Sequence, residues 1–304
     1  MRFNFILHES MKKLLFLLFI PFLACTQKQT TELDTTQLIE DLRFISSDAT
    51  EGRRTGTEGN KIAREYLVTR FQEEGAEPFQ NSYTHEFTFE NRRTEEEMTG
   101  INVIAKVNGK SDSMIVITAH YDHLGRNDSL IFNGADDDAS GTAALLAFAD
   151  YFVKNQPNHT LVFAAFDAEE MGLQGARAFV EDSVLLSKVK LNINMDMISQ
   201  NDSSEIYAAG TFHYPKTKPI LESIDTAGLK LLFGHDTPDL GYNDWTFSSD
   251  HGPFHSKGVP FVYFGVEDHE NYHKHTDDFE TIPQEFYKSS VQLILNTVLA
   301  FDKQ

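Results

Sequence analysis

The sequence predicts a three-layer α/β/α sandwich around a central mixed, mostly parallel sheet. Four short apolar runs have the length and composition of strands that are buried on both faces. They cover residues 114–118, 161–166, 191–195 and 260–264. Helical patterns alternate with these runs, and such alternation is typical of α/β folds.

The predicted helices lie before, between and after these strands along the chain. They cover residues 61–74, 141–153, 172–181 and 285–301, and the last of them is amphipathic. Residues 83–89 and 102–107 are predicted to add an antiparallel edge to the sheet. The segment EGRRTGTEGN, at residues 51–60, is rich in glycine and charge and is therefore predicted to be a loop.

The chain of 304 residues is acidic, with a formal net charge of -20 from 26 basic and 46 acidic side chains. Its hydrophobic fraction of 40% is enough for one sizeable core. The negative charge argues against binding to nucleic acid or to anionic membrane surfaces. It suits a protein that meets neutral or cationic substrates, such as peptides with a free amine, although solubility alone would also explain it.

Residues 11–25 read MKKLLFLLFIPFLAC and have the layout of a signal peptide. The apolar run is too short to span a bilayer, and Ala24-Cys25 resembles the end of a bacterial lipobox in which Phe22 replaces the usual leucine. We expect a lipoprotein signal at 1–25 (Met11 being a possible true start), a polar tether at 26–33 and the folded domain at 34–304. The protein would then be exported and held on the periplasmic face of the membrane or on the cell surface, only through a lipid on Cys25. An uncleaved hydrophobic anchor is the alternative.

Ligand-type side chains follow each predicted strand where it ends. AHYDH (119–123) follows the first strand, DAEE (167–170) the second, Asp196 the third, and Tyr272-His273 the fourth after a short loop. A further acidic segment, GADDDASG, opens an Ala/Leu-rich helix. Because ligands bind at the carboxyl ends of strands in open α/β sheets, we expect these side chains to converge.

A cluster of carboxylates of this size would repel itself unless cations neutralised it. Histidine with Asp and Glu, and without cysteine, suits zinc or a similar divalent ion. Two metal ions about 4 Å apart need one bridging carboxylate and roughly two more ligands each. The cluster offers one bridge, two histidines and two terminal carboxylates, which predicts a site for two Zn²⁺ ions.

Five segments occur together in the order and spacing of a known family. They are AHYDH, GADDDASG, FDAEEMGLQGARAF, NMDM and NYHKHTDD. The chain resembles the co-catalytic zinc exopeptidases, which include bacterial leucyl aminopeptidases, glutamate carboxypeptidases and glutaminyl cyclases. The resemblance extends from about residue 42 to the C-terminus, and EGRRTGTEGN and SSDHGPFHSKGVP also look like segments of the family.

The resemblance implies five metal ligands, which are His120, Asp137, Glu170, Asp196 and His273. Asp137 would bridge the two ions, and its peptide bond to Asp138 would be cis, as it often is in the family. Asp196 would share the ion of His120, and Glu170 that of His273. His275 is the alternative to His273.

The same resemblance implies the groups around the metals. Glu169 would be the general base, Asp122 would orient His120, and Asp250 would be an acid that hydrogen-bonds near the base. At least one of Asp136 and Asp138 is expected to be a loop or helix-cap residue.

Other polar and aromatic residues have an ordinary structural explanation. Five histidines have no partner pattern and are expected to lie on the surface or in the core: His85, His159, His213, His235 and His269. Three aromatic residues could line a substrate pocket or belong to the core: Phe264, Trp245 and Tyr272. Ser140 lacks a G-x-S-x-G context, which argues against a serine hydrolase.

The resemblance implies a monomeric metal-dependent aminopeptidase that acts on peptides with a free N-terminus through a metal-bridging water activated by Glu169. A glutaminyl cyclase with one zinc is an alternative, and so is a carboxypeptidase. The carboxypeptidase would need a cation for the terminal carboxylate, and the sequence does not place the four candidates, Arg53, Arg54, Arg126 and Arg177. A peptide-binding lipoprotein without activity is the non-enzyme alternative, and the intact set of base and ligands argues against it.

Overall fold

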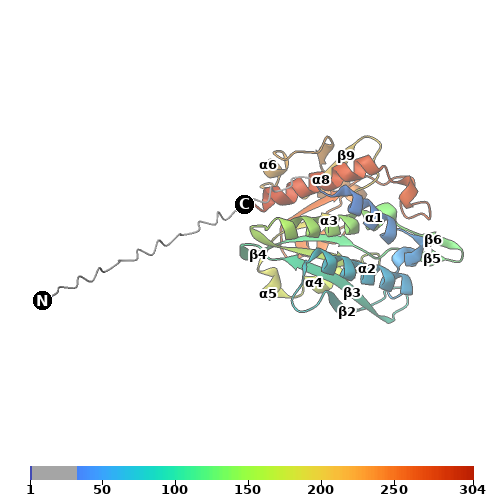
Figure 1. Cartoon of the computed structure of the whole chain (residues 1–304). Coiled ribbons are helices and arrows are strands. Elements are labelled where there is room, and N and C mark those ends of the chain that lie inside the picture. The colour runs from blue at the N-terminus through green and yellow to red at the C-terminus, as the bar shows by residue number, and fades with distance from the viewer. Residues whose placement is uncertain (2–32) are drawn as a thin grey trace. The chain divides into compact units, whose positions relative to one another are not determined.

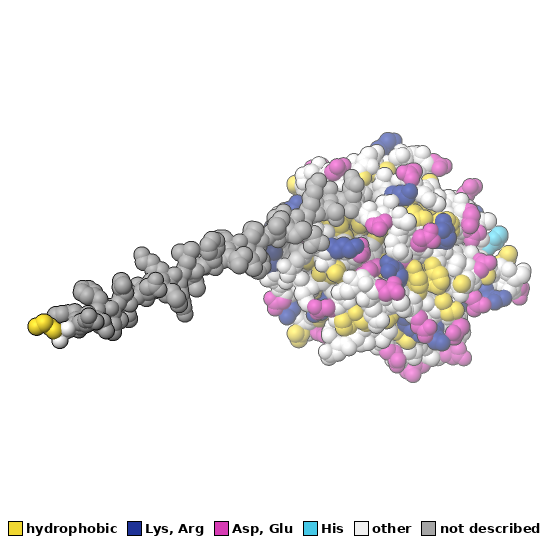
Figure 2. Space-filling model, viewed as in Figure 1, with side chains coloured by type: hydrophobic (Ala, Val, Ile, Leu, Met, Phe, Trp, Pro, Cys, Tyr) yellow, Lys and Arg dark blue, Asp and Glu magenta, His cyan; other side chains and the backbone are white. Residues whose placement is uncertain are grey.

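The computed structural model describes Met1 and residues 33–304 (Figure 1). The expected signal peptide, the lipidated Cys25 and nearly all of the tether therefore lie outside the described residues. Within the described part, no helix is both long and apolar enough to cross a membrane. Figure 2 shows acidic and basic side chains interspersed on the visible face of this part.

Four parallel strands form the centre of the sheet. In spatial order they are β7 (His159–Phe166), β4 (Ser111–His120), β8 (Val189–Met195) and β11 (Phe261–Gly265). These are the four apolar runs identified in the sequence. Their side chains alternate between two cores, since Ile115 and Ile117 pack in one and Met114 and Val116 in the other.

Antiparallel strands extend the sheet on one side, as predicted. β3 (Glu97–Val107) pairs with β7, while β2 (Thr84–Glu90) and β1 (Glu77–Pro78) pair with β3. On the other side, β9 (Glu205–Ala209) runs antiparallel to β11 and parallel to β10 (Lys230–Phe233). The sequence did not predict β9 and β10, because both are short and β10 is only partly buried.

Helices cover both faces of this sheet, which confirms the three-layer sandwich. One core holds α1 (Thr35–Ile45), α2 (Glu58–Glu74), α3 (Gly141–Lys154) and α8 (Gln284–Phe301) (Figure 1). The other holds α4 (Gln174–Phe179), α5 (Ser183–Leu186) and α7 (His251–Ser256). The smaller elements are α6 (Lys218–Leu221), the β5–β6 hairpin (Gly125–Asn127, Leu130–Phe132) and the short helices η1 (Asp48–Arg53), η2 (Ala135–Ser140), η3 (Pro238–Asn243) and η4 (Phe279–Thr281).

The prediction of a loop at residues 51–60 is correct except at the end of that segment. Although η1 extends to Arg53, residues 51–53 have left-handed φ values of 47°, 67° and 52°. Only the last residues are helical, since they begin α2, where the Thr57 hydroxyl accepts a hydrogen bond from the N–H of Asn60. Gly52 has a φ of 67°, and a Cβ there would come within 2.4 Å of two carbonyl oxygens of the β5–β6 hairpin. The glycine that suggested a loop is therefore needed for close packing.

His251, at the start of α7, is fully buried beneath the sheet. Its Nε2 donates to the backbone carbonyl of Trp245 at 2.8 Å, and its ring stacks on Tyr263 with centroids 4.5 Å apart. Burial lowers the pKa of His251 from 6.5 to about 3. The folded protein therefore keeps this imidazole neutral at pH values where an unfolded chain would protonate it.

We expect this difference to destabilise the fold in acid. The contribution of His251 is fully present above pH 6.5 and is lost as the pH falls below the unfolded value, at up to about 1.4 kcal/mol per pH unit. Urea unfolding at pH 7 and pH 5 should show that the free energy of unfolding falls less for His251→Gln than for the wild type. His275→Gln, which changes an exposed histidine, should behave like the wild type. An equal fall in the free energy of unfolding of the wild type and His251→Gln would contradict the prediction.

Candidate metal centre

The predicted site residues converge at the carboxyl ends of the four central strands. β4 ends at His120, the DAEE segment follows β7, Asp196 follows β8, and the loop after β11 carries His273. Asp137 lies in η2, between β4 and α3. Since the four strands are parallel, their ends share one edge of the sheet, which is where the sequence placed the site.

One oxygen of Asp137 faces a first donor group. Nε2 of His120 lies 3.3 Å from Oδ1 of Asp137 and 3.5 Å from Oδ1 of Asp196. Nδ1 of His120 lies 3.1 Å from the backbone carbonyl of Asp122. Because a carbonyl only accepts, Nδ1 carries a proton, and Nε2 is the ring nitrogen that faces the two carboxylates. A carboxylate oxygen of Glu169 also lies within 4.8 Å of His120 and Asp196 donor atoms.

The other oxygen of Asp137 faces a second donor group, which contains two histidines. Oδ2 lies 3.1 Å from Nε2 of His273 and 3.8 Å from Nδ1 of His123. Oε1 of Glu170 lies 2.9 Å from Nδ1 of His123 and 3.6 Å from Nε2 of His273. His123 has no role predicted from the sequence, although it is the last residue of the AHYDH motif and follows a strand end.

The backbone around Asp137 is fixed by two buried charges. The peptide bond between Asp137 and Asp138 is cis, as the resemblance implied. Arg53 is fully buried and donates to the carbonyls of Tyr121, Asn133 and Gly134. The carboxylate of Asp277 accepts from the N–H groups of Asp136 and Asp137 at 3.0 and 3.1 Å.

The two acids that flank Asp137 are buried and have structural partners. Asp138 accepts from the N–H groups of Gly141 at 2.9 Å and His120 at 3.1 Å, so it joins the start of α3 to the end of β4. Asp136 accepts from Ser199 at 2.7 Å and pairs with Nε2 of His269 at 2.9 Å. The expectation of a cap thus fits Asp138, whereas Asp136 is not a cap and His269 is not without a partner.

Asp122 contacts both halves of the cluster. Its carboxylate accepts from the N–H groups of Glu169 at 3.0 Å and Glu170 at 3.3 Å, and lies 3.8 Å from Nδ1 of His120. His120 is thus held more closely by the backbone carbonyl of Asp122 than by its carboxylate. The carboxylate mainly positions the backbone of the two glutamates.

Asp250 is fully buried, and neither of its carboxylate oxygens has a hydrogen-bond partner among the described residues. The expected hydrogen bond near the base is therefore not made by this side chain. Burial raises the pKa of Asp250 to about 7, against the opposing effect of His120. The negative charge of Asp250 in turn helps to raise the pKa of Glu169.

The pKa values of Asp137 and Glu169 are shifted in opposite directions. Burial alone would raise the pKa of Asp137, but His123, His120 and His273 hold it well below its usual range. Burial raises the pKa of Glu169 well above its usual value, and the charges of Asp196, Asp250 and Glu170 add to this effect against that of His120. The site thus combines a firmly ionised aspartate between the two donor groups with a glutamate that tends to hold a proton.

A cavity of about 480 Å³ opens onto both donor groups. Its wall includes six acids, Asp137, Glu169, Glu170, Asp196, Glu267 and Asp268, and no Lys or Arg among the described residues. Trp245 and Tyr272 also line it, whereas Phe264 lies in the core. None of the four arginines considered in the sequence lines this cavity.

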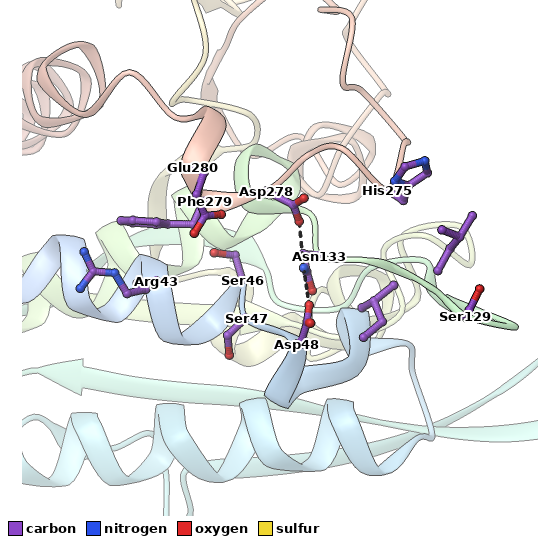
Figure 3. Close-up of a pocket in the computed structure, with 12 residues that line it drawn as sticks. Arg43, Ser46, Ser47, Asp48, Ser129, Asn133, His275, Asp278, Phe279 and Glu280 are labelled. Carbon is purple, nitrogen blue, oxygen red and sulfur yellow. Dashed lines mark hydrogen bonds between the residues drawn. The ribbon is translucent and has the colours of Figure 1, made fainter.

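His275 lies apart from the donor groups, in another cavity of about 480 Å³ (Figure 3). There, Nδ2 of Asn133 donates to the carboxylates of Asp48 and Asp278, both at 2.9 Å. These bonds join η1, the segment before η2 and the loop that carries His273. Of the two candidate histidines, His273 is the one that contacts the second donor group.

Hydrogen bonding also distinguishes this cluster from an ordinary polar core. Nδ1 of His123 and Oε1 of Glu170 are buried and only 2.9 Å apart, yet neither has a hydrogen-bond partner among the described residues. Buried donor atoms that lie close together without hydrogen bonds, and that also lie within 4.8 Å of a donor atom of Asp137, fit a group of metal ligands. The donors are imidazole nitrogens and carboxylate oxygens, which suit zinc.

The chain is similar in sequence to a known bacterial aminopeptidase. The chain is 29% identical over 254 residues to aminopeptidase YwaD of Bacillus subtilis, a match that covers 79% of this chain and 52% of YwaD. The chain spans about half the length of YwaD and less of the other curated relatives.

Solved structures share the fold at low sequence identity. An aminopeptidase from Aneurinibacillus sp. strain AM-1 has a TM-score of 0.70 at 16% identity, covering 89% of this chain and 94% of that one. A glutaminyl cyclase from Fimbriiglobus ruber has a TM-score of 0.71 at 17% identity, covering 88% of this chain and 95% of that one. The model of peptidase family M28 matches residues 102–298, more than half of the chain, and the protein therefore belongs to peptidase family M28.

Proposed function

We propose that this protein is a zinc aminopeptidase that holds two zinc ions and hydrolyses the N-terminal bond of peptides. The observation that carries the proposal is the placement of Asp137. Its two oxygens face different groups of histidine and carboxylate donors, at 3.1–3.8 Å. A carboxylate that faces two donor groups in this way suits the bridging ligand of a two-metal site.

The proposed ligands divide between the two ions. His120 and Asp196 would hold one ion and Glu170 and His273 the other, with Asp137 between them. When bound, zinc polarises a carbonyl group and lowers the pKa of a coordinated water. The buried, acidic end of the sheet supplies the negative charge that two divalent cations require.

Glu169 is proposed to move the proton. A carboxylate oxygen of Glu169 lies within 4.8 Å of donor atoms of His120 and Asp196, and the proposal gives Glu169 the proton rather than a place among the ligands. A raised pKa suits a group that takes a proton from water and returns it to a leaving amine near neutral pH. Asp122 would keep Glu169 in place through its hydrogen bond to the backbone N–H.

The wall of the cavity favours a substrate with a free amine. Its carboxylates attract an ammonium group, whereas the terminal carboxylate of a carboxypeptidase substrate would find no Lys or Arg on the described wall. Leu173, Met197 and Val266 supply apolar surface for the side chain of the first residue. This favours the aminopeptidase over the carboxypeptidase.

The proposal includes export, a lipid anchor at Cys25 and a monomeric state. Export and the lipid anchor rest on the layout of residues 11–25 and on the position of the single cysteine.

We expect Glu169→Gln to lower kcat by about 10²- to 10⁴-fold, because the amide cannot accept a proton from water. Its zinc content should stay that of the wild type, since Glu169 is not a proposed ligand. Zinc is measured by mass spectrometry, and activity with leucyl-p-nitroanilide. Glu285→Gln, which changes a side chain that is 91% exposed on α8, is the control. Wild-type activity of Glu169→Gln would remove the residue from the mechanism.

Two measurements separate the proposed aminopeptidase from a cyclase and a carboxypeptidase. They are the end of the peptide that reacts and the number of zinc ions per chain. We expect about two zinc ions per chain, cleavage of leucyl-p-nitroanilide, and no cleavage when the leucine is N-acetylated, because acetylation removes the cationic amine. Cyclisation of a glutaminyl peptide with one zinc per chain would instead identify a cyclase. Release of C-terminal residues would identify a carboxypeptidase.

A further inference from the structure

We propose that His123 is a fourth protein ligand of the second zinc ion, together with Asp137, Glu170 and His273. The inference deepens the proposed function, because it presupposes that the site holds two ions. It makes the two ions unequal, since the second would be enclosed by four protein donors and the first by three.

The ring of His123 is buried and fixed in place. It is only 1% exposed, and it lies three residues after the end of β4. Gly134 lies directly against it, because a Cβ at that position would come within 2.6 Å of Cδ2 of the ring. Gly134 also has a φ of +55°, so both its backbone and its lack of a side chain make room for the imidazole.

Neither ring nitrogen of His123 has a hydrogen-bond partner within the described part of the chain. An unpaired polar group in the interior costs about 1–3 kcal/mol, and buried polar atoms usually have partners. Coordination of Nδ1 removes that cost at one of the two nitrogens. It also explains why Oε1 of Glu170 can lie 2.9 Å away without accepting a hydrogen bond.

The spacing of the donors fits one tetrahedral ion. With zinc–ligand bonds of about 2.0–2.1 Å, neighbouring donors of a tetrahedron lie about 3.3 Å apart. His123 Nδ1 lies 2.9 Å from Glu170 and 3.8 Å from Asp137, and His273 Nε2 lies 3.1 Å from Asp137 and 3.6 Å from Glu170. These four of the six edges bracket the tetrahedral value on both sides. Donor atoms of His123, Asp137 and Glu170 lie within 4.8 Å of one another, whereas His273 is outside that group, so the exposed side chain of His273 must shift to complete a tetrahedron.

A fourth protein ligand changes what the second ion does. Sites closed by four protein ligands hold zinc structurally, whereas sites with three leave a position for water or substrate. The second ion would thus chiefly fix Asp137 and Glu170, and the first would offer the more open position. His273 has 41% of its side chain exposed, whereas His123 is buried. The position of the His123 ring is therefore the more firmly fixed of the two.

The test removes His273 and measures whether His123 still holds the second ion. If His123 coordinates, His273→Asn keeps three donors for the second ion and should retain about two zinc ions per chain after dialysis. The double variant His123→Asn/His273→Asn should fall to about one, and His123→Asn alone should lose the second ion at a lower chelator concentration than the wild type. The matched control is His275→Asn, which should behave like the wild type.

Zinc per chain and the rise in Tm on adding zinc are the two readouts, and neither needs activity. Loss of one zinc from His273→Asn, with His123→Asn unchanged, would overturn the inference and leave His123 as a packing residue. The result with His273→Asn does not depend on the folding of the His123 variants, because that variant keeps His123, and a His123→Asn variant that retains two zinc ions must itself be folded. If the wild type itself holds fewer than two ions, the proposed two-metal function fails instead.

Discussion

The site depends on how the backbone around Asp137 is held. Arg53 donates to the carbonyls on one side of this segment, and Asp277 accepts from the N–H groups on the other. Burial lowers the pKa of Arg53 to about 10, against the raising effect of nearby Asp137 and Asp277, so the guanidinium remains charged at neutral pH. With these two charges in place, the Asp137 carboxylate can present one oxygen to each donor group.

The same contacts make the ligand segments depend on one another. Asp277 lies four residues after His273, and Asp278 accepts from Asn133, which is four residues before Asp137. The loop that carries His273 is therefore anchored to the loop that carries Asp137. Asp122 links the other two segments, because its carbonyl faces His120 and its carboxylate holds Glu169 and Glu170. Buried charged groups that are fully bonded in this way favour a single arrangement.

The parts of this structure that could be predicted are those with a local signature. Strands buried on both faces appear as continuous apolar runs, and ligand-type residues at their ends converge wherever the strands are parallel. Arg53 and Asp277 have no such signature, because their partners are backbone groups far away in the chain. The loop prediction at residues 51–60 failed only at its end, where Thr57 starts α2. The tertiary contact of Gly52 could not be predicted, because its partners lie in the distant β5–β6 hairpin. β9 and β10 were missed because they are short strands beyond the central four.

His123 illustrates why residue type and position are not sufficient for a site. The AHYDH motif contains two histidines near a strand end, and nothing in the motif says which rings turn inward. The direction of the second ring depends on the space left by Gly134, eleven residues later, and on the left-handed backbone there. A ring placed by such a distant contact becomes visible only when the unpaired nitrogens and the facing carboxylates are seen together. The burial of a polar group without a hydrogen-bond partner is thus the physical signal that sequence reasoning lacked, and it points to what the second donor group holds.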